Sequence, residues 1–269
     1  MGVARVFGFR ARMKNVQQFS ELAVGHQPDA SLRQTFDILR EKWDEVPAGL
    51  NNRVRSSDLL RGQDEDLLAA WARCFSDAST FSRRGWRHTL YRDTFRDKRI
   101  IDVGCGLAFD TVHFAENGAR VTFVDLVESN VEVVRRLCEL KGLNNCDFCY
   151  MRDLTSLSEL DGYYDVIYCC GSLINAPLEA IRLEAKVLLE HLPIGGRWME
   201  LAYPKARWER EGRRPFEKWG ENTDGGAPWM EWHDLDKVLG YLAPAKFDVV
   251  LAFEYHNSDF NWFDLIKVA

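Results

Sequence analysis

Residues Arg99–Asp110 read RIIDVGCGLAFD, an apolar run that ends in an acid and passes into a Gly-Cys-Gly turn. A parallel strand that ends in such a turn and opens a helix brings its backbone close to a ligand only where glycine removes the Cβ, as at Gly104 and Gly106. The next apolar run, RVTFVD, closes on Asp125, whose carboxylate is placed to accept hydrogen bonds from the two hydroxyls of a ribose. The pairing predicts a site for a nucleoside-type cofactor.

Strand-like and helix-like segments alternate after Lys98, which is typical of a parallel sheet covered by helices on both faces. The last two strand-like segments are joined by about eight residues, too few for a crossover helix, so we expect the last strand to run antiparallel. The predicted fold is α/β, a doubly wound, mostly parallel seven-stranded sheet. Its strands are expected at 99–103, 120–124, 147–151, 164–170, 196–202, 247–253 and 262–268.

Residues 98–269 resemble the class I S-adenosylmethionine-dependent methyltransferases of the small-molecule type, which have a Rossmann-like fold. The resemblance rests on the DxGxG form of the turn, which begins at Asp102, and on acids after the second and third strands. Ala108 stands where the family often has a third glycine, and we expect only a small loss of clearance there.

The resemblance implies S-adenosylmethionine as cofactor and a role for each matching residue. The residues expected to line the methionine and ribose portion are Asp102, Gly104 and Gly106. Asp125 is expected to hold the ribose hydroxyls, Leu126 to flank the adenine, and Asp153 to accept from the adenine amino group, with Leu154 beside it. Cys170 and Gly171 are expected to close the pocket.

A nicotinamide- or flavin-dependent enzyme is the alternative at the level of fold, because it also uses a glycine turn and a ribose-binding acid. Its full fingerprint needs a third glycine, and Phe109 stands at that position. Asp102 before the turn and the acid Asp153 after the third strand favour the methyl donor.

Composition narrows the function classes. A net charge of −6 argues against a nucleic-acid partner, which would call for a basic surface.

No apolar stretch is long enough to span a bilayer and no secretory signal is evident, so we expect a cytoplasmic protein that does not engage a membrane. The histidines and carboxylates of the chain do not have the spacing of metal ligands. The CxxC at Cys146 and Cys149 has no two further ligands at matching spacing, so no metal is predicted. Homo-oligomer formation is left open.

Two regions flank the predicted cofactor site. Residues 1–97 are expected to form an N-terminal helical cap, with helical patterns around 30–44 and 64–74 and a polar stretch at 51–61. Residues 98–269 are expected to form the catalytic domain, and the long connection 203–233, rich in tryptophan, is expected to be an ordered lid over the methyl group.

The lid and its surroundings supply the expected acceptor site. The residues expected to bind the substrate are Tyr203, Trp229 and Trp232. A hydroxyl acceptor needs a base, and His233 and His256 are the histidines expected nearest the strand ends. Relatives often carry a histidine after the fourth strand, where this chain reads GSLINAP, so the base is not assigned by resemblance.

The sequence therefore predicts a methyltransferase that acts on a small polar metabolite by O-methylation of a sugar or sugar-like molecule, whose ring would lie against aromatic side chains. The alternatives are an N-methyltransferase of a small amine and a catalytically silent scaffold that only binds the cofactor.

The change Asp125→Ala tests the cofactor prediction. We expect the unmodified chain to bind S-adenosylmethionine and S-adenosylhomocysteine in calorimetric titrations, and the variant to lose most of that affinity, because the ribose hydroxyls lose their acceptor. Binding of neither ligand by the unmodified chain would favour the dinucleotide alternative.

Overall fold

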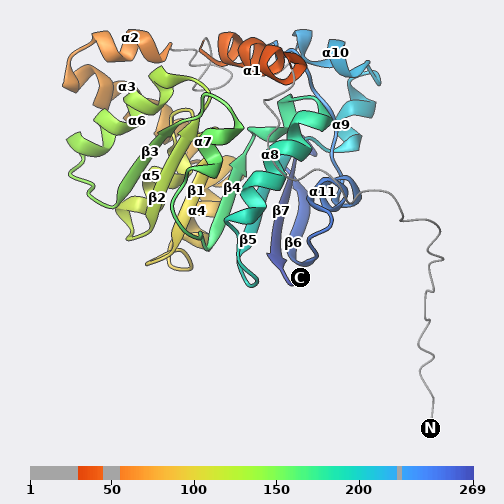
Figure 1. The fold of residues 1–269 in the computed structure, drawn as a ribbon. Coiled ribbons are helices and arrows are strands. Elements are labelled where there is room, and N and C mark those ends of the chain that lie inside the picture. The colour runs from red at the N-terminus through yellow and green to blue at the C-terminus, as the bar shows by residue number, and fades with distance from the viewer. Residues whose placement is uncertain (1–29, 45–54, 223–225) are drawn as a thin grey trace, which may run out of the picture.

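The computed structural model describes residues 30–44, 55–222 and 226–269 (Figure 1). A seven-stranded sheet runs through it in the order β3-β2-β1-β4-β5-β7-β6. The first five strands are mutually parallel, and β7 pairs antiparallel with both β5 and β6. The strands are β1 (Arg99–Val103), β2 (Arg120–Asp125), β3 (Cys146–Tyr150), β4 (Val166–Cys170), β5 (Arg197–Ala202), β6 (Phe247–Tyr255) and β7 (Phe260–Lys267). The predicted fold class is confirmed.

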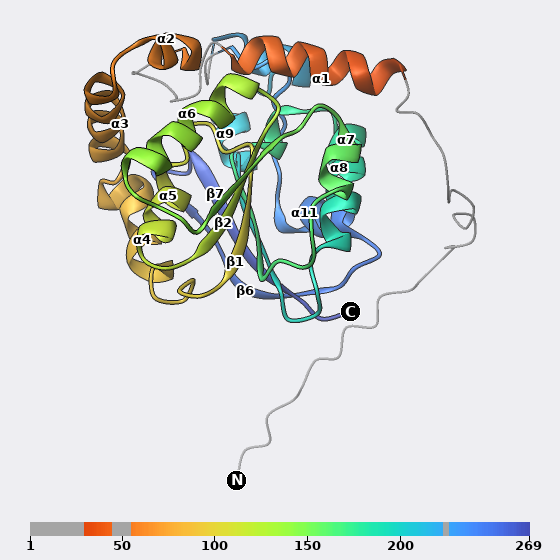
Figure 2. The same cartoon turned by 60° about the vertical axis from the view of Figure 1, so that its left-hand side comes forward.

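Helices cover both faces of this sheet, and Figure 2 shows α3 to α6 on one side and α7, α8 and α11 on the other. The helices are α1 (Ala30–Trp43), α2 (Ser56–Arg61), α3 (Asp64–Ala78), α4 (Trp86–Tyr91), α5 (Phe109–Glu116), α6 (Glu128–Leu140), α7 (Leu154–Ser158), α8 (Leu178–Glu190), α9 (Lys205–Arg210), α10 (Phe216–Trp219) and α11 (Leu235–Leu242). A π-helical turn, η1, spans Phe81–Gly85, and 3-10 turns span Leu173–Asn175 (η2) and Gly220–Asn222 (η3).

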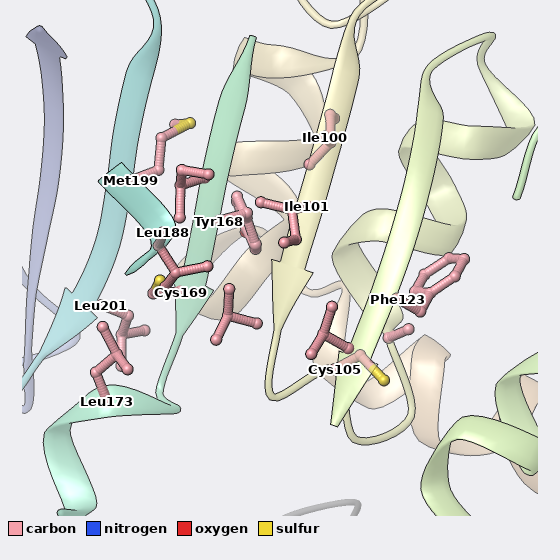
Figure 3. Packing of buried hydrophobic residues seen from close by; sticks show 14 of the residues in the cluster. Ile100, Ile101, Cys105, Phe123, Tyr168, Cys169, Leu173, Leu188, Met199 and Leu201 are labelled. Carbon is pink, nitrogen blue, oxygen red and sulfur yellow. The ribbon is translucent and has the colours of Figure 1, made fainter. Parts of the chain in front are cut away.

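The core forms where apolar side chains of the parallel strands meet the helices. Strands buried on both faces read as continuous apolar runs, as in RIIDV and VIYCC. Figure 3 shows Ile100, Ile101 and Tyr168 within the sheet, with Cys105 and Leu173 beyond the carboxyl ends of β1 and β4. The loops at that edge are therefore anchored on the same core that holds the strands.

The N-terminal helices lie at this edge and on one face of the sheet. In α1, Leu32, Phe36 and Leu39 recur at helical spacing and are buried, which seats the helix along the strand ends (Figure 1). Residues 1–29 and 45–54 of the expected cap lie outside the described residues.

The polar stretch at 51–61 contains a helix, α2, within its described residues. The Ser56 hydroxyl, which is buried, donates to Asn130 at the start of α6 at 2.5 Å, and Leu59 is buried as well. Tertiary packing against α6 therefore accompanies a helix in a stretch that the sequence marks only as polar.

A buried polar network ties α4 to the antiparallel end of the sheet. The Tyr91 hydroxyl donates to Asp264 at 3.1 Å and accepts from Trp262 Nε1 at 3.0 Å. Arg197 forms an ion pair with the same Asp264 carboxylate at 2.9 Å. The network fixes the position of β7 relative to the helices that precede β1.

The change Tyr91→Phe should lower the free energy of unfolding by about 1–3 kcal/mol, because it leaves the buried Trp262 indole N–H without its acceptor. Denaturant unfolding measures this, with Tyr163→Phe at an exposed position as the control. Equal stabilities of the two variants would contradict the role of the network.

Candidate functional site: a cavity at the carboxyl ends of the strands

A cavity of about 410 Å³ lies at the carboxyl ends of the parallel strands. Its walls come from α1, α3, η1, the loops after β1, β2 and β4, and the tips of β5, β6 and β7. Open α/β sheets bind ligands at this edge, and the volume is in the range of small-molecule sites.

The glycine turn forms one wall. The amides of Gly104 and Cys105 both donate to the Val124 carbonyl, at 2.8 and 3.0 Å, which holds the turn against the end of β2. Gly104 has φ +68°, and a Cβ built there would lie 2.5 Å from the Ser172 Cβ. Only glycine fits this position, because both the backbone conformation and the neighbouring loop exclude a side chain.

Asp125 ends β2 beside this turn, where its carboxylate is nearly fully buried yet lines the cavity. It accepts from the Gly106 amide at 2.8 Å, the Val127 amide at 2.9 Å and Asn130 Nδ2 at 3.2 Å. Burial raises its pKa, and these hydrogen bonds oppose that shift. Asp125 therefore both fixes the turn and offers a carboxylate edge to a ligand.

A second acid, Asp102, lies at the end of β1 and lines the same cavity. The Thr111 hydroxyl donates to it. Burial raises its pKa to about 7. Removal from water thus disfavours the charged form of this carboxyl.

Apolar residues and one arginine define the end of the cavity near β2 and β3. Leu126 and Met151 line it, together with Leu39 of α1. Arg40 of the same helix donates from Nε to the Leu126 carbonyl at 3.0 Å and from Nη2 to the Arg152 carbonyl at 2.9 Å. These bonds fasten α1 across the tips of both strands.

Asp153 and Leu154, expected to bind the adenine, are absent from the cavity lining. The Asp153 carboxylate instead caps α7, accepting from the Thr155 amide at 2.9 Å. An acid at the end of a strand that opens directly into a helix can serve as an N-cap, and here that local bond takes one of the two carboxylate oxygens.

Two arginines converge on one carboxylate at the other end of the cavity. Asp110 lies 3.1 Å from Arg84 Nη1 and 3.2 Å from Arg87 Nη2, and accepts from the Tyr168 hydroxyl at 2.6 Å and from His88 Nε2 at 2.8 Å. Arg87 is about 1% exposed. The arginines outnumber the carboxylate, so this part of the wall is cationic.

The charged groups in this cluster stabilise one another's ionised forms. Burial opposes ionisation of Asp110, yet Arg87 and Arg84 hold its pKa well below the usual range. Burial likewise opposes the charge on Arg87, and Asp110 and Cys170 outweigh it, so its pKa lies well above the usual value. Cys170 accepts from Arg87 Nη1 at 3.1 Å and lines the cavity with its neighbour Gly171, as expected.

An aromatic wall closes the cavity at β5, β6 and β7. It consists of Tyr203, Tyr255, His256 and Phe260, all of which line the cavity. The rings of Tyr203 and Tyr255 lie 6.2 and 5.8 Å from that of Phe260, and His256 stacks on Phe260 at 6.1 Å. Among the substrate and base residues expected from sequence, the structure brings Tyr203 and His256 to the cavity.

The other expected acceptor residues lie elsewhere. His233 is fully buried outside the cavity lining, and burial lowers its pKa to about 4. Its ring packs 5.9 Å from that of Tyr241 in α11. A role for His233 at the reacting centre is therefore not supported, because its position at the start of a helix turns the ring into the core.

Trp229 and Trp232 are also outside the cavity lining. Trp232 stacks beneath the ammonium groups of Lys237 at 3.2 Å and Lys205 at 5.3 Å, and lies 6.2 Å from the Trp208 ring. Of the expected lid 203–233, only Tyr203 lines the cavity among its described residues. Trp219, also in the lid, packs its ring 5.8 Å from that of Tyr203.

Sequence reasoning missed the two arginines and Asp110. They come from η1, α4 and α5, and the signal that would have found them is RRGWR before the first strand, which reads as an ordinary charged helix face. Among the described residues, no group of three or more potential metal ligands forms a site, and no helix is long and apolar enough to cross a membrane.

Comparisons with known proteins agree with this geometry. Residues 100–196 match the family model of a methyltransferase domain. These residues form a methyltransferase domain. The recognition made from the sequence is confirmed, and the cofactor of such a domain is S-adenosylmethionine.

Curated relatives of the methyltransferase domain include ubiquinone biosynthesis O-methyltransferases. That of Coxiella burnetii (strain Dugway 5J108-111) is 33% identical over 84 residues, covering 31% of this chain and 35% of the relative. That of Bordetella parapertussis is 32% identical over 120 residues, covering 44% and 46%. The chain thus spans between a third and a half of the length of these relatives.

Solved structures share the fold of the methyltransferase domain and its surroundings. Magnesium protoporphyrin IX methyltransferase from Synechocystis PCC 6803, with bound S-adenosylhomocysteine, matches with a TM-score of 0.54 at 17% identity over 86% of this chain and 98% of that one. The 1,6-didemethyltoxoflavin-N1-methyltransferase of Burkholderia thailandensis matches with a TM-score of 0.52 at 19% identity over 79% and 89%.

The cavity of the methyltransferase domain fits S-adenosylmethionine. The cradle at Gly104 excludes a Cβ, Asp125 presents a carboxylate beside it, and Leu126 and Met151 offer apolar surface for a flat base. At the other end, Arg84 provides a cation for the carboxylate of the methionine portion.

The change Asp110→Asn should lower the free energy of unfolding by about 3–5 kcal/mol, because it leaves the buried Arg87 guanidinium and the partly exposed Arg84 guanidinium without their counter-charge. Denaturant unfolding checks this against Asp93→Asn, which alters an exposed carboxylate in surface ion pairs. A loss no larger than that of the control would mean that Asp110 does not hold the arginines.

Proposed function

We propose that this protein transfers the methyl group of S-adenosylmethionine to a hydroxyl of a small acceptor. The observation that carries the proposal is the convergence of the Gly104 cradle, Asp125 and the Arg84 guanidinium on one cavity that also has an aromatic wall. Such a cavity has room for a nucleoside, a charged amino-acid tail and a ring-shaped molecule.

Acidic, apolar and basic residues along the cavity would each hold a different part of the cofactor. Asp125 would accept from the ribose hydroxyls, Leu126 and Met151 would flank the adenine, and Arg84 would bind the carboxylate. Asp102 would accept a hydrogen bond from the ammonium group. When bound, the cofactor supplies an electrophilic methyl group on a sulfonium.

The acceptor would lie against the aromatic wall. Tyr203, Tyr255 and Phe260 offer flat apolar faces to a ring, which suits the sugar or sugar-like acceptor that the sequence suggests. A phenol is a second candidate, because the same faces stack on an aromatic ring and the relatives are named for O-methylation in ubiquinone biosynthesis.

His256 is the candidate for accepting the hydroxyl proton. It lines the cavity from the β6–β7 turn, where His256, Asn257 and Ser258 all have positive φ. Arg210 donates to the Asn257 carbonyl at 3.1 Å and pairs with Asp259, which braces this turn against α9. A braced turn would hold the imidazole in place for the transfer, since such alignment supplies much of the rate.

Incubation with S-adenosylmethionine and three acceptor panels, sugars, phenols and amines, tests the proposal. We expect methylated product from a hydroxyl compound, detected by mass spectrometry together with S-adenosylhomocysteine. Turnover of amines alone would favour the N-methyltransferase alternative, and cofactor binding without turnover of any acceptor would favour the silent scaffold.

With an active acceptor identified, His256→Gln should lower kcat about 10²- to 10⁴-fold, because the general base is lost, with cofactor affinity little changed. The matched control is His113→Gln, on α5 outside the cavity lining, whose kcat should stay near that of the unmodified chain. Equal rates for both variants would remove His256 as the base.

A further inference from the structure

The cavity wall formed by η2 and α8 contains polar groups with no partner among the described residues. Glu184 is 7% exposed and lines the cavity, and its carboxyl makes no hydrogen bond or ion pair there. Beside it in the lining, Asn175 is 2% exposed and its Oδ1 has no partner, and the Ser172 hydroxyl is likewise unpaired. Such groups cost stability unless something pairs with them.

Glu184 lies on the apolar face of its helix. Ala180, Ile181, Ala185 and Leu188 of α8 are buried on that face, so an apolar side chain would be the ordinary occupant of position 184. A carboxyl buried without a partner weakens the fold, which leaves contact with a ligand as the reason for its place in the cavity wall.

The surroundings indicate which part of a ligand Glu184 would meet. Burial, and after it the negative charge of Asp125, raise the pKa of Glu184 to about 8. Asp125 and Asn130, which binds the Asp125 carboxylate, line the same cavity. Glu184 and Asp125, the acid expected to bind the ribose, therefore face the same cavity.

We propose that Glu184 is a second acidic contact to the nucleoside half of the bound cofactor, where its carboxyl and the Asn175 carboxamide oxygen receive hydrogen bonds from the ribose hydroxyls or the adenine amino group. The inference rests on the proposed function and adds to it a residue from α8. Both side chains are ligand-binding residues in this assignment, and the chemistry of methyl transfer does not depend on them.

Calorimetric titration with two probes tests this assignment. S-adenosylhomocysteine carries both halves of the cofactor, and 5′-methylthioadenosine carries the nucleoside without the amino-acid tail. Glu184→Leu should weaken the binding of both probes by the same factor, roughly ten-fold, as expected for the loss of a buried hydrogen bond. Its Tm should equal or exceed that of the unmodified chain, because a buried unpaired carboxyl is replaced by an apolar group.

Two further variants complete the design. Glu184→Gln keeps the volume and one acceptor oxygen, so its affinities should lie between those of the unmodified chain and Glu184→Leu. Glu190→Leu, at the exposed end of the same helix, should leave both affinities unchanged.

Three results would overturn the assignment while leaving the proposed function intact. They are unchanged affinity of Glu184→Leu, weaker binding of S-adenosylhomocysteine but not of 5′-methylthioadenosine, and unfolding of Glu184→Leu, which would make the carboxyl structural. Failure of the unmodified chain to bind S-adenosylhomocysteine would instead overturn the proposed function, and this assignment with it.

Discussion

The carboxylate of Asp110 holds the η1–α4 segment to the sheet. It receives Arg84 and Arg87 from the segment before β1, His88 from α4 and the Tyr168 hydroxyl from β4. Four donors on one buried carboxylate offset the cost of taking it out of water. Because the same arginines form a wall of the cavity, the attachment of the η1–α4 segment and the shape of this part of the site depend on one interaction.

The cavity has carboxyl groups in one part and guanidinium groups in another. Asp125 and Glu184 supply the carboxyl groups of the first part, and burial raises the pKa of each. The arginines near Asp110 make the other part cationic. A ligand with a hydroxyl-rich nucleoside at one end and a carboxylate at the other would complement both, and this polarity would set the direction in which S-adenosylmethionine lies.

The sheet could be read from the sequence because each strand carries its own signal. The runs ending at Val103 and Asp125 were predicted to within a residue, since buried parallel strands are continuous apolar segments bounded by turns. At Ala108 the sequence predicts a small loss of clearance, and the structure shows a left-handed residue with φ 52° before α5. The consequence there is backbone strain, which the identity of the residue does not reveal.

The sequence by itself determined the seven-stranded fold, the glycine cradle and Asp125, because strand pattern, turn chemistry and the acid at the strand end are local properties. Only the tertiary structure decided which distant side chains meet. It brought Arg84, Arg87 and Glu184 to the cavity and turned His233 into the core, because long side chains on helices follow packing rather than sequence spacing. The cofactor end of the site can therefore be predicted largely from the sequence. The acceptor end depends on how the helices and the β6–β7 turn assemble around it.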